Sequence, residues 1–280
     1  MLAVPPKSSD ADDESSTESL MIPRRPWRPL VTASAGVGAA VLALAFLLGT
    51  VPVFLIVGIG MLLLAGGWVL LLGLPSPRGT TGVLAGAGLI LLCGGVLSME
   101  ARTSLLPGAV ALAMIVEFLH QLGRRDGRPR LVESVSASVT GIGVLTSGAC
   151  VLLLTPTDEG VACSVAVFGA VAVASLADLG LRWGAGGPVA GVVAVALGAG
   201  AAWWLGTIMA AGLPAPLLFA AGGLAAGSSY ALRQVQSALP TLFGRRAQLA
   251  SGVASVFATG VIAYALTWLS LGPDMMAVVR

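Results

Sequence analysis

Charged residues are scarce in this sequence, where Asp, Glu, Lys and Arg together make up 10% of 280 residues. An average soluble domain carries about 25%, so a water-exposed globule is excluded. Hydrophobic residues make up 56% of the chain. They are concentrated in runs of about 18 to 24 residues, the length of helix that crosses a hydrocarbon core. The sequence therefore predicts an all-α, polytopic bundle of transmembrane helices in a lipid bilayer.

Motifs of the common catalytic chemistries are also missing. The sequence has no Walker phosphate loop, no paired-histidine metalloprotease motif, no G-x-S-x-G elbow and no CxxC pair. It also lacks the aspartate-rich motifs of intramembrane prenyltransferases and CDP-alcohol phosphotransferases. These absences weaken the case for an enzyme without eliminating it, and we expect no catalytic residues that a motif could name.

Metal ligands and basic stripes are few as well. The chain has one histidine and three cysteines. A di-iron site of the Glu-x-x-His type needs a second such pair and further glutamates, which this chain lacks. We expect no metal, no cofactor and no nucleic-acid partner. Cys150 and Cys163 flank one short loop, and the sequence leaves open whether they are bridged.

Hydropathy and proline positions together place about nine spans. The apolar stretch 31–74 is 44 residues long. One helix of that length would measure about 66 Å, so the stretch must fold back between Gly49 and Pro52. Pro107 and the other prolines of the apolar region fall in first turns, where a missing N–H costs least. The expected spans are 31–49, 52–74, 81–98, 105–122, 137–155, 161–181, 188–210, 213–232 and 249–271.

The distribution of positive charge predicts the orientation of these spans. With the N-terminus in the cytoplasm, thirteen of the fifteen Lys and Arg residues fall on the cytoplasmic side, leaving Arg102 and Arg280 outside. We therefore expect a disordered, acidic, Ser-rich cytoplasmic leader over 1–26, a single transmembrane domain over 27–272 and a short external tail over 273–280. Arginine greatly outnumbers lysine, which favours a bacterial inner (plasma) membrane.

Polar side chains gather on one face of the 105–122 span. Glu117, His120 and Gln121, followed by Arg124, are spaced i, i+3, i+4 and i+7, which places them on one side of a helix. Ionisable groups inside a span are costly and often functional. Glu117 and His120 could shuttle protons or help to bind a cation. Alternatively, these groups only hydrogen-bond to one another near a helix end.

The loop that follows is the densest charged segment of the chain. Its arginines have forked donors that can bind a phosphate or a carboxylate, including an anionic lipid headgroup. The simpler interpretation is a positive loop that only sets the topology. The arginines of this loop are Arg124, Arg125, Arg128 and Arg130.

The 161–181 span brings charge to the same membrane face. Asp178 and Arg182 are four residues apart and could form a helical ion pair. They could also complete one ligand-binding or ion-binding pocket with Glu117, His120 and Arg124. The sequence permits this pocket but cannot show that the helices meet.

Three functions from different classes fit this topology. We favour a transport-associated, permease-like protein with a polar pocket on the cytoplasmic side. A membrane-embedded enzyme acting on a phosphate-bearing lipid is the second possibility. The third is a structural or regulatory subunit of a membrane complex. Its helices would pack closely, through small residues, against a membrane-protein partner or against a second copy in a homo-oligomer. Small-residue pairs spaced i, i+4 occur at Gly82 and Gly86, Gly187 and Gly191, and Gly223 and Gly227.

Overall fold

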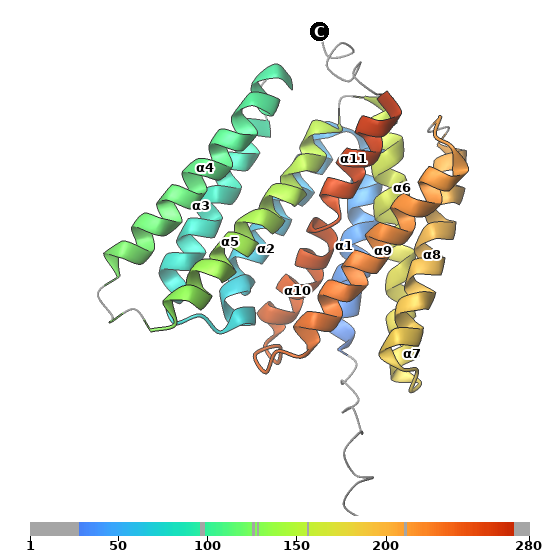
Figure 1. Cartoon of the computed structure of the whole chain (residues 1–280). Helices are drawn as coiled ribbons and strands as arrows, with labels where there is room; N and C mark the ends of the chain where they lie inside the picture. The colour runs from blue at the N-terminus through green and yellow to red at the C-terminus, as the bar shows by residue number, and fades with distance from the viewer. Residues whose placement is uncertain are drawn as a thin grey trace, which may run out of the picture.

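The computed structural model describes residues 28–95, 99–124, 127, 129–155, 157–209 and 212–271, which form helices and no strand (Figure 1). The expected leader and tail lie outside these residues. The helices are α1 (Pro29–Leu48), α2 (Thr50–Leu72), α3 (Pro77–Gly95), α4 (Met99–Gly123), α5 (Leu131–Cys150), α6 (Asp158–Ala174), α7 (Asp178–Arg182), α8 (Gly187–Ile208), α9 (Ala215–Ser237), α10 (Arg245–Phe257) and α11 (Gly260–Leu271), with 3-10 turns η1 (Val151–Leu153) and η2 (Ser175–Ala177).

Eight helical segments are long and apolar enough to cross a membrane. Three of them combine consecutive elements, because α5 continues into η1, α6 continues through η2 into α7, and α10 is followed closely by α11. The glycine-rich α3 is not among the eight, but it packs beside α2 and α4 in the same bundle (Figure 1). The predicted all-α polytopic bundle is confirmed.

The helices cover the predicted spans but extend beyond several of them, since α5 begins at Leu131 rather than 137 and α9 ends at Ser237 rather than 232. A further difference concerns a proline. α4 begins at Met99, so Pro107 lies inside the helix, and the prediction that it occupies a first turn is wrong. The apolar part of this helix begins only at Leu106. Hydropathy therefore marks where α4 becomes apolar, whereas the backbone is already helical across the more polar residues before it.

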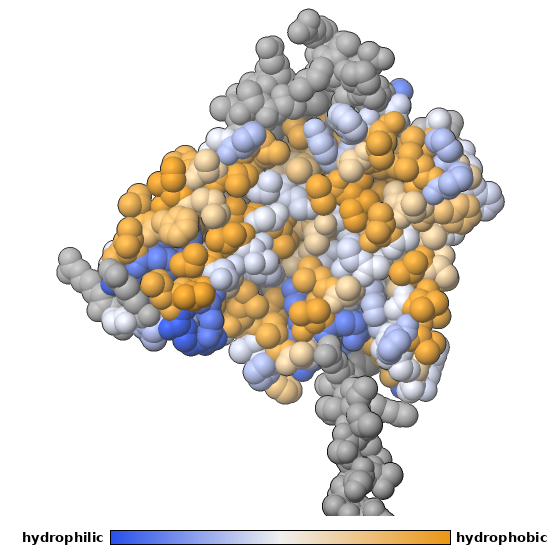
Figure 2. All heavy atoms as spheres, viewed as in Figure 1, coloured by the Kyte–Doolittle hydropathy of each residue, from blue (hydrophilic) through white to orange (hydrophobic). Residues whose placement is uncertain are grey.

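The spans of the bundle differ widely in how much of their surface is buried. The α6 to α7 segment is the most buried of the eight, and the apolar part of α4 is the least buried. Large apolar side chains cover much of the outer surface (Figure 2). Because such a surface is unfavourable in water, it supports a lipid bilayer as the surroundings of this chain.

Positive charge is confined to one end of the bundle among the side chains that the structure describes. We call this end, where α1, α3, α5 and α10 begin and α4, α7 and α9 end, the arginine-rich end. Figure 2 shows hydrophilic residues gathered along it. Asp158 and Glu159 open α6 at the opposite end. The arginines that define this end are Arg28, Arg78, Arg124, Arg130, Arg182, Arg233, Arg245 and Arg246.

Candidate functional site

Two predicted residues on α4 and Arg124, which directly follows this helix, form one series of hydrogen bonds. Gln121 Nε2 donates to Glu117 Oε1 at 2.6 Å, and Arg124 Nη1 donates to Gln121 Oε1 at 2.9 Å. The same Arg124 nitrogen reaches Ser134 Oγ on α5 at 3.4 Å. Each hydrogen bond within α4 and its end links residues about one helical turn apart, as the i, i+3 and i+4 spacing predicts. The series therefore runs from Arg124 at the arginine-rich end to the Glu117 carboxylate, deeper in the bundle.

Glu117 is fully buried and only partly satisfied. Its exposed fraction is 0%, and its second carboxylate oxygen, Oε2, has no hydrogen-bond partner. The hydroxyl of Thr80, on the neighbouring α3, is also buried without a partner. Buried polar atoms in native proteins are nearly always hydrogen-bonded. An orphaned carboxylate oxygen at full burial therefore points to a proton or ligand that binds there.

His120 lies at the edge of this cluster rather than within it. It is half-buried, and its Nε2 lies 3.4 Å from Ser76 Oγ, just before α3. The ring sits directly over Gly79, where an added Cβ would come within 1.9 Å of His120 Cε1. Gly79 thus allows α3 to approach α4 closely enough for the imidazole to fit between them.

In the loop between α4 and α5, Arg130 connects two helices. Arg130, with a φ of 53°, lies in the left-handed region directly before α5. Its guanidinium forms an ion pair with Glu133, and Nη1 donates to the Gly73 carbonyl at 3.0 Å. Arg130 therefore ties the start of α5 to the end of α2. Arg125 and Arg128 lie outside the described residues.

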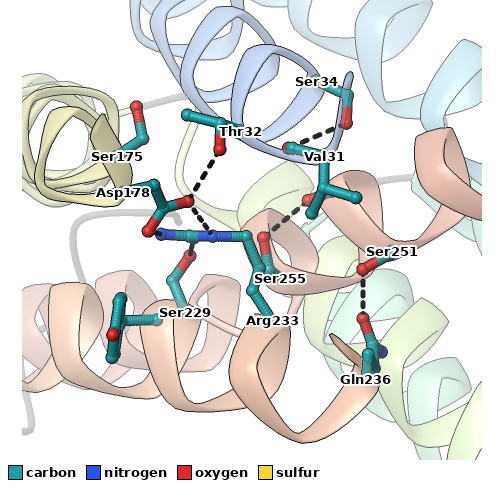
Figure 3. A network of polar contacts seen from close by, with 12 residues as sticks. Val31, Thr32, Ser34, Ser175, Asp178, Ser229, Arg233, Gln236, Ser251 and Ser255 are labelled. Atoms are coloured by element: carbon teal, nitrogen blue, oxygen red, sulfur yellow. Dashed lines mark hydrogen bonds and ion pairs between the residues drawn. The ribbon is translucent and has the colours of Figure 1, made fainter. Parts of the chain in front are cut away.

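Asp178 belongs to a second group of polar residues, which we call the α9 network (Figure 3). Its Oδ2 accepts hydrogen bonds from Thr32 Oγ1 and Arg233 Nε, both at 3.0 Å, and its Oδ1 accepts one from Arg233 Nη2 at 3.2 Å. Arg233 Nη1 also donates to Ser229 Oγ at 2.7 Å. The network comprises Thr32, Asp178, Ser229 and Arg233, and it joins α1, α7 and α9.

The two groups do not form the single pocket that the sequence permitted. α4 lies at one edge of the bundle and α7 at the other (Figure 1). The Asp178 carboxylate forms a forked pair with Arg233, which is 55 positions away in the sequence. Arg182 is exposed at the end of α7. Glu117, Gln121 and Arg124 are thus brought together, with His120 adjacent, while Asp178 and Arg182 lie elsewhere.

The sequence also contains a signal for the α9 network, which the spacing on α4 and α7 alone does not reveal. Ser229, Arg233 and Gln236 are spaced i, i+4 and i+7 on α9, and all three are buried. Gln236 Oε1 accepts a hydrogen bond from Ser251 Oγ on α10 at 2.6 Å, which extends the polar face toward the middle of the bundle. A buried arginine with polar neighbours at helical spacing indicates a partner helix carrying an acid.

A third polar feature is the break between α10 and α11. Ser147 Oγ of α5 donates to the Phe257 carbonyl at 2.7 Å and accepts from the Val261 N–H at 3.0 Å. In an uninterrupted helix those two backbone groups would bond to each other. The serine hydroxyl is inserted between them, and an added Cβ at Gly260 would come within 2.1 Å of the Ser147 carbonyl oxygen.

The small-residue pairs divide between internal and open faces. Gly191 and Gly227 each face a side chain of the neighbouring helix within 4 Å, Tyr230 and Val195 respectively, which accounts for them as contacts within the chain. At Gly82 and Gly86, nothing lies within 4 Å of an added Cβ.

Among the described residues the cysteines are free, including Cys150 and Cys163, and no group of three His, Cys, Asp or Glu residues could hold a metal ion.

A comparison with known protein families, curated proteins and solved structures finds no match to this chain.

Proposed function

We propose that this chain is a transport-associated, permease-like protein of a bacterial plasma membrane. The observation that carries the proposal is the interruption of the α10 to α11 span. That span covers Arg245–Ser270, and its two helices are separated at residues 258 and 259, close to its midpoint. Helices broken near the middle of the membrane are a feature of transporters, where they surround the bound substrate or ion.

The construction of the break supports movement. Thr259 and Gly260 are buried in the bundle. Irregular backbone at this depth is tolerated only when its polar groups are satisfied within the protein. Ser147 satisfies the Phe257 carbonyl and the Val261 N–H with one hydroxyl, while Thr259 keeps backbone bonds to both sides of the break. The angle between α10 and α11 can therefore change through the exchange of few hydrogen bonds, because one backbone bond between the two helices is already replaced by a side chain.

The charge distribution supports the orientation. Basic residues accumulate on the cytoplasmic side of membrane proteins, so we place the arginine-rich end in the cytoplasm. The hydrogen-bonded group of Glu117, Gln121 and Arg124, which we call the α4 cluster, then forms the polar site on the cytoplasmic side. Arg245 and Arg246 are exposed at that end, where they would meet anionic lipid headgroups. A lipid-modifying enzyme is less well supported, because Arg124 and Arg130 already bind groups of this chain.

Flux through purified protein in lipid vesicles tests the proposal. The full chain is reconstituted with a pH-sensitive dye inside the vesicles, and a potassium diffusion potential is imposed with valinomycin. We expect faster proton entry than in protein-free vesicles. The same vesicles are tested for sodium and chloride with ion-sensitive dyes. If none of the three ions moves faster than in protein-free vesicles, the proposal is contradicted.

A pair of serine variants tests the role of the break. Ser147→Ala removes the hydroxyl that bridges α10 and α11 and should lower the flux severalfold. Ser228→Ala is the matched control, because Ser228 is exposed on α9 and bonds only to the Ala225 carbonyl, at 3.1 Å. Equal fluxes in the two variants would show that the break has no part in transport.

A further inference from the structure

The α4 cluster contains the one buried carboxylate oxygen without a hydrogen-bond partner among the described residues. Glu117 has 0% exposure, and Oε2 is buried and unpartnered while Oε1 accepts one amide hydrogen at 2.6 Å. A carboxylate that keeps its charge at such burial normally accepts several donors or pairs with a cation. A single amide donor leaves this group poorly stabilised in its charged form.

We propose that Glu117 Oε2 is a proton-binding site and that the proton is the coupling or transported ion of this protein. The first part stands on the burial of Glu117, and the second rests on the function proposed above. The step is a simple transfer, because a lone pair on Oε2 takes a proton from hydronium and water is released. The reverse step returns the proton to water, and no other bond forms or breaks.

The surroundings favour a proton over a metal cation. A hard cation needs several oxygen ligands. The hydrogen-bond partner of Glu117 is Gln121, whose amide oxygen already accepts a hydrogen bond from Arg124 at 2.9 Å. Arg124 also contributes a fixed positive charge to the same hydrogen-bonded chain. A proton requires only one lone pair of one oxygen to neutralise the carboxylate, so it needs none of the further oxygen ligands that a hard cation requires.

The other titratable groups leave this role to Glu117. Among the side chains of α4 that the structure describes, the other titratable group is His120, half-buried and one turn toward the arginine-rich end, and Arg124 directly follows the helix. The helices that pack against α4 carry Arg78 and Cys93 on α3 and Glu133 and Cys150 on α5. Arg78, Cys93 and Glu133 are exposed, and Glu133 is paired with Arg130. Glu117 is therefore the buried carboxyl of this region.

Dicyclohexylcarbodiimide provides a direct probe, since it modifies protonated carboxyl groups in apolar surroundings. The full chain in lipid nanodiscs is treated over a range of pH and the adduct is located by mass spectrometry. We expect an adduct on Glu117 whose yield falls at least severalfold as the pH is raised. Asp178, held by Arg233, should stay unmodified. An absence of adduct on Glu117 at every pH, or a yield independent of pH, would overturn the proposal.

Two variants and one further measurement complete the test. Glu117→Gln should abolish the adduct, while Glu133→Gln, at an exposed carboxylate on the same membrane face, should keep it. Infrared absorption of wild-type protein in H2O and D2O should show a protonated carboxyl band that disappears at high pH, which requires no variant to fold. A band that persists in Glu117→Gln would assign the proton to another group and overturn the proposal.

The outcomes separate this inference from the proposed function. If Glu117 forms the adduct but wild-type vesicles show no flux of any tested ion, the proton site stands and the transport function fails. If vesicles carry protons, and Glu117→Gln carries them at the same rate with no adduct in the wild type, transport stands and the proton site fails.

Discussion

Asp178 and Glu117 are both buried carboxylates near the arginine-rich end, but they are held very differently. Asp178 accepts three hydrogen bonds, two of them from the forked guanidinium of Arg233. Glu117 accepts one from a neutral amide. Asp178 joins three helices, whereas the hydrogen bond that Glu117 accepts comes from its own helix. The comparison indicates that a fully satisfied buried acid holds the fold together, whereas a partly satisfied one is free to bind a proton or ligand.

The largest expected effect comes from breaking the Asp178 to Arg233 pair. Asp178→Asn and Arg233→Met each leave one charge buried without its partner, which typically costs about 3–5 kcal/mol. We expect a large drop in the thermal midpoint and in the monodisperse fraction in detergent. The double variant Asp178→Leu with Arg233→Met should recover part of this loss. Single variants with near wild-type midpoints would remove the distinction between the two carboxylates.

Two serines that bond to arginines sharpen the comparison. Ser229→Ala removes a 2.7 Å hydrogen bond to buried Arg233 and should cost about 1.5–3 kcal/mol, the range for bonds to charged groups. Ser134→Ala removes the longer 3.4 Å contact with Arg124 and should cost less than about 1 kcal/mol. Thermal midpoints of the two purified variants provide the measurement. A larger loss in Ser134→Ala would contradict the order of the two networks.

Two glycines test how tightly each region is packed. At Gly252, which lies where α10 packs against α1, an added Cβ would be 1.9 Å from Ser34 Oγ and 2.8 Å from the backbone nitrogen of Ala35. Gly252→Ala should therefore cost about 1–3 kcal/mol through overpacking. At Gly79 the obstacle is the ring of His120, a side chain that can rotate away. Gly79→Ala should lower the midpoint less, and the reverse order would contradict this view.

The smallest effect is expected from Glu117→Gln. The substitution keeps the shape and removes a charge that has one neutral donor, so the stability should change by less than about 1 kcal/mol and can increase. Asp178→Asn, the same chemical change in the other network, is the matched comparison. Equal losses of folded protein in both variants would show that Glu117 is as structural as Asp178.

The spans could be predicted from the sequence because lipid solvation acts on each helix separately, as hydropathy, Gly49 and Pro52 show. The polar chain from Glu117 to Arg124 could also be predicted, since helical spacing alone brings these residues together. The partner of Asp178 could not. Arg182 is near in sequence, but Arg233 reaches the carboxylate from another helix through packing that one sequence does not specify. For the same reason, nothing in the sequence indicated that Ser147 of α5 would enter the ladder of the last span.

The position of that last span affects how the chain is made. α10 packs against α1, α2, α5 and α9, so the end of the described chain fills the space among helices that leave the ribosome before it, α1 and α2 first of all. Until it arrives, α1 and α2 lack a neighbour that their small residues, such as Gly67 beside Ala250, are shaped to receive. Translation that stops before residue 245 would yield a set of helices without α10 to fill the space among them. We expect such products to be bound by membrane chaperones or degraded rather than to accumulate.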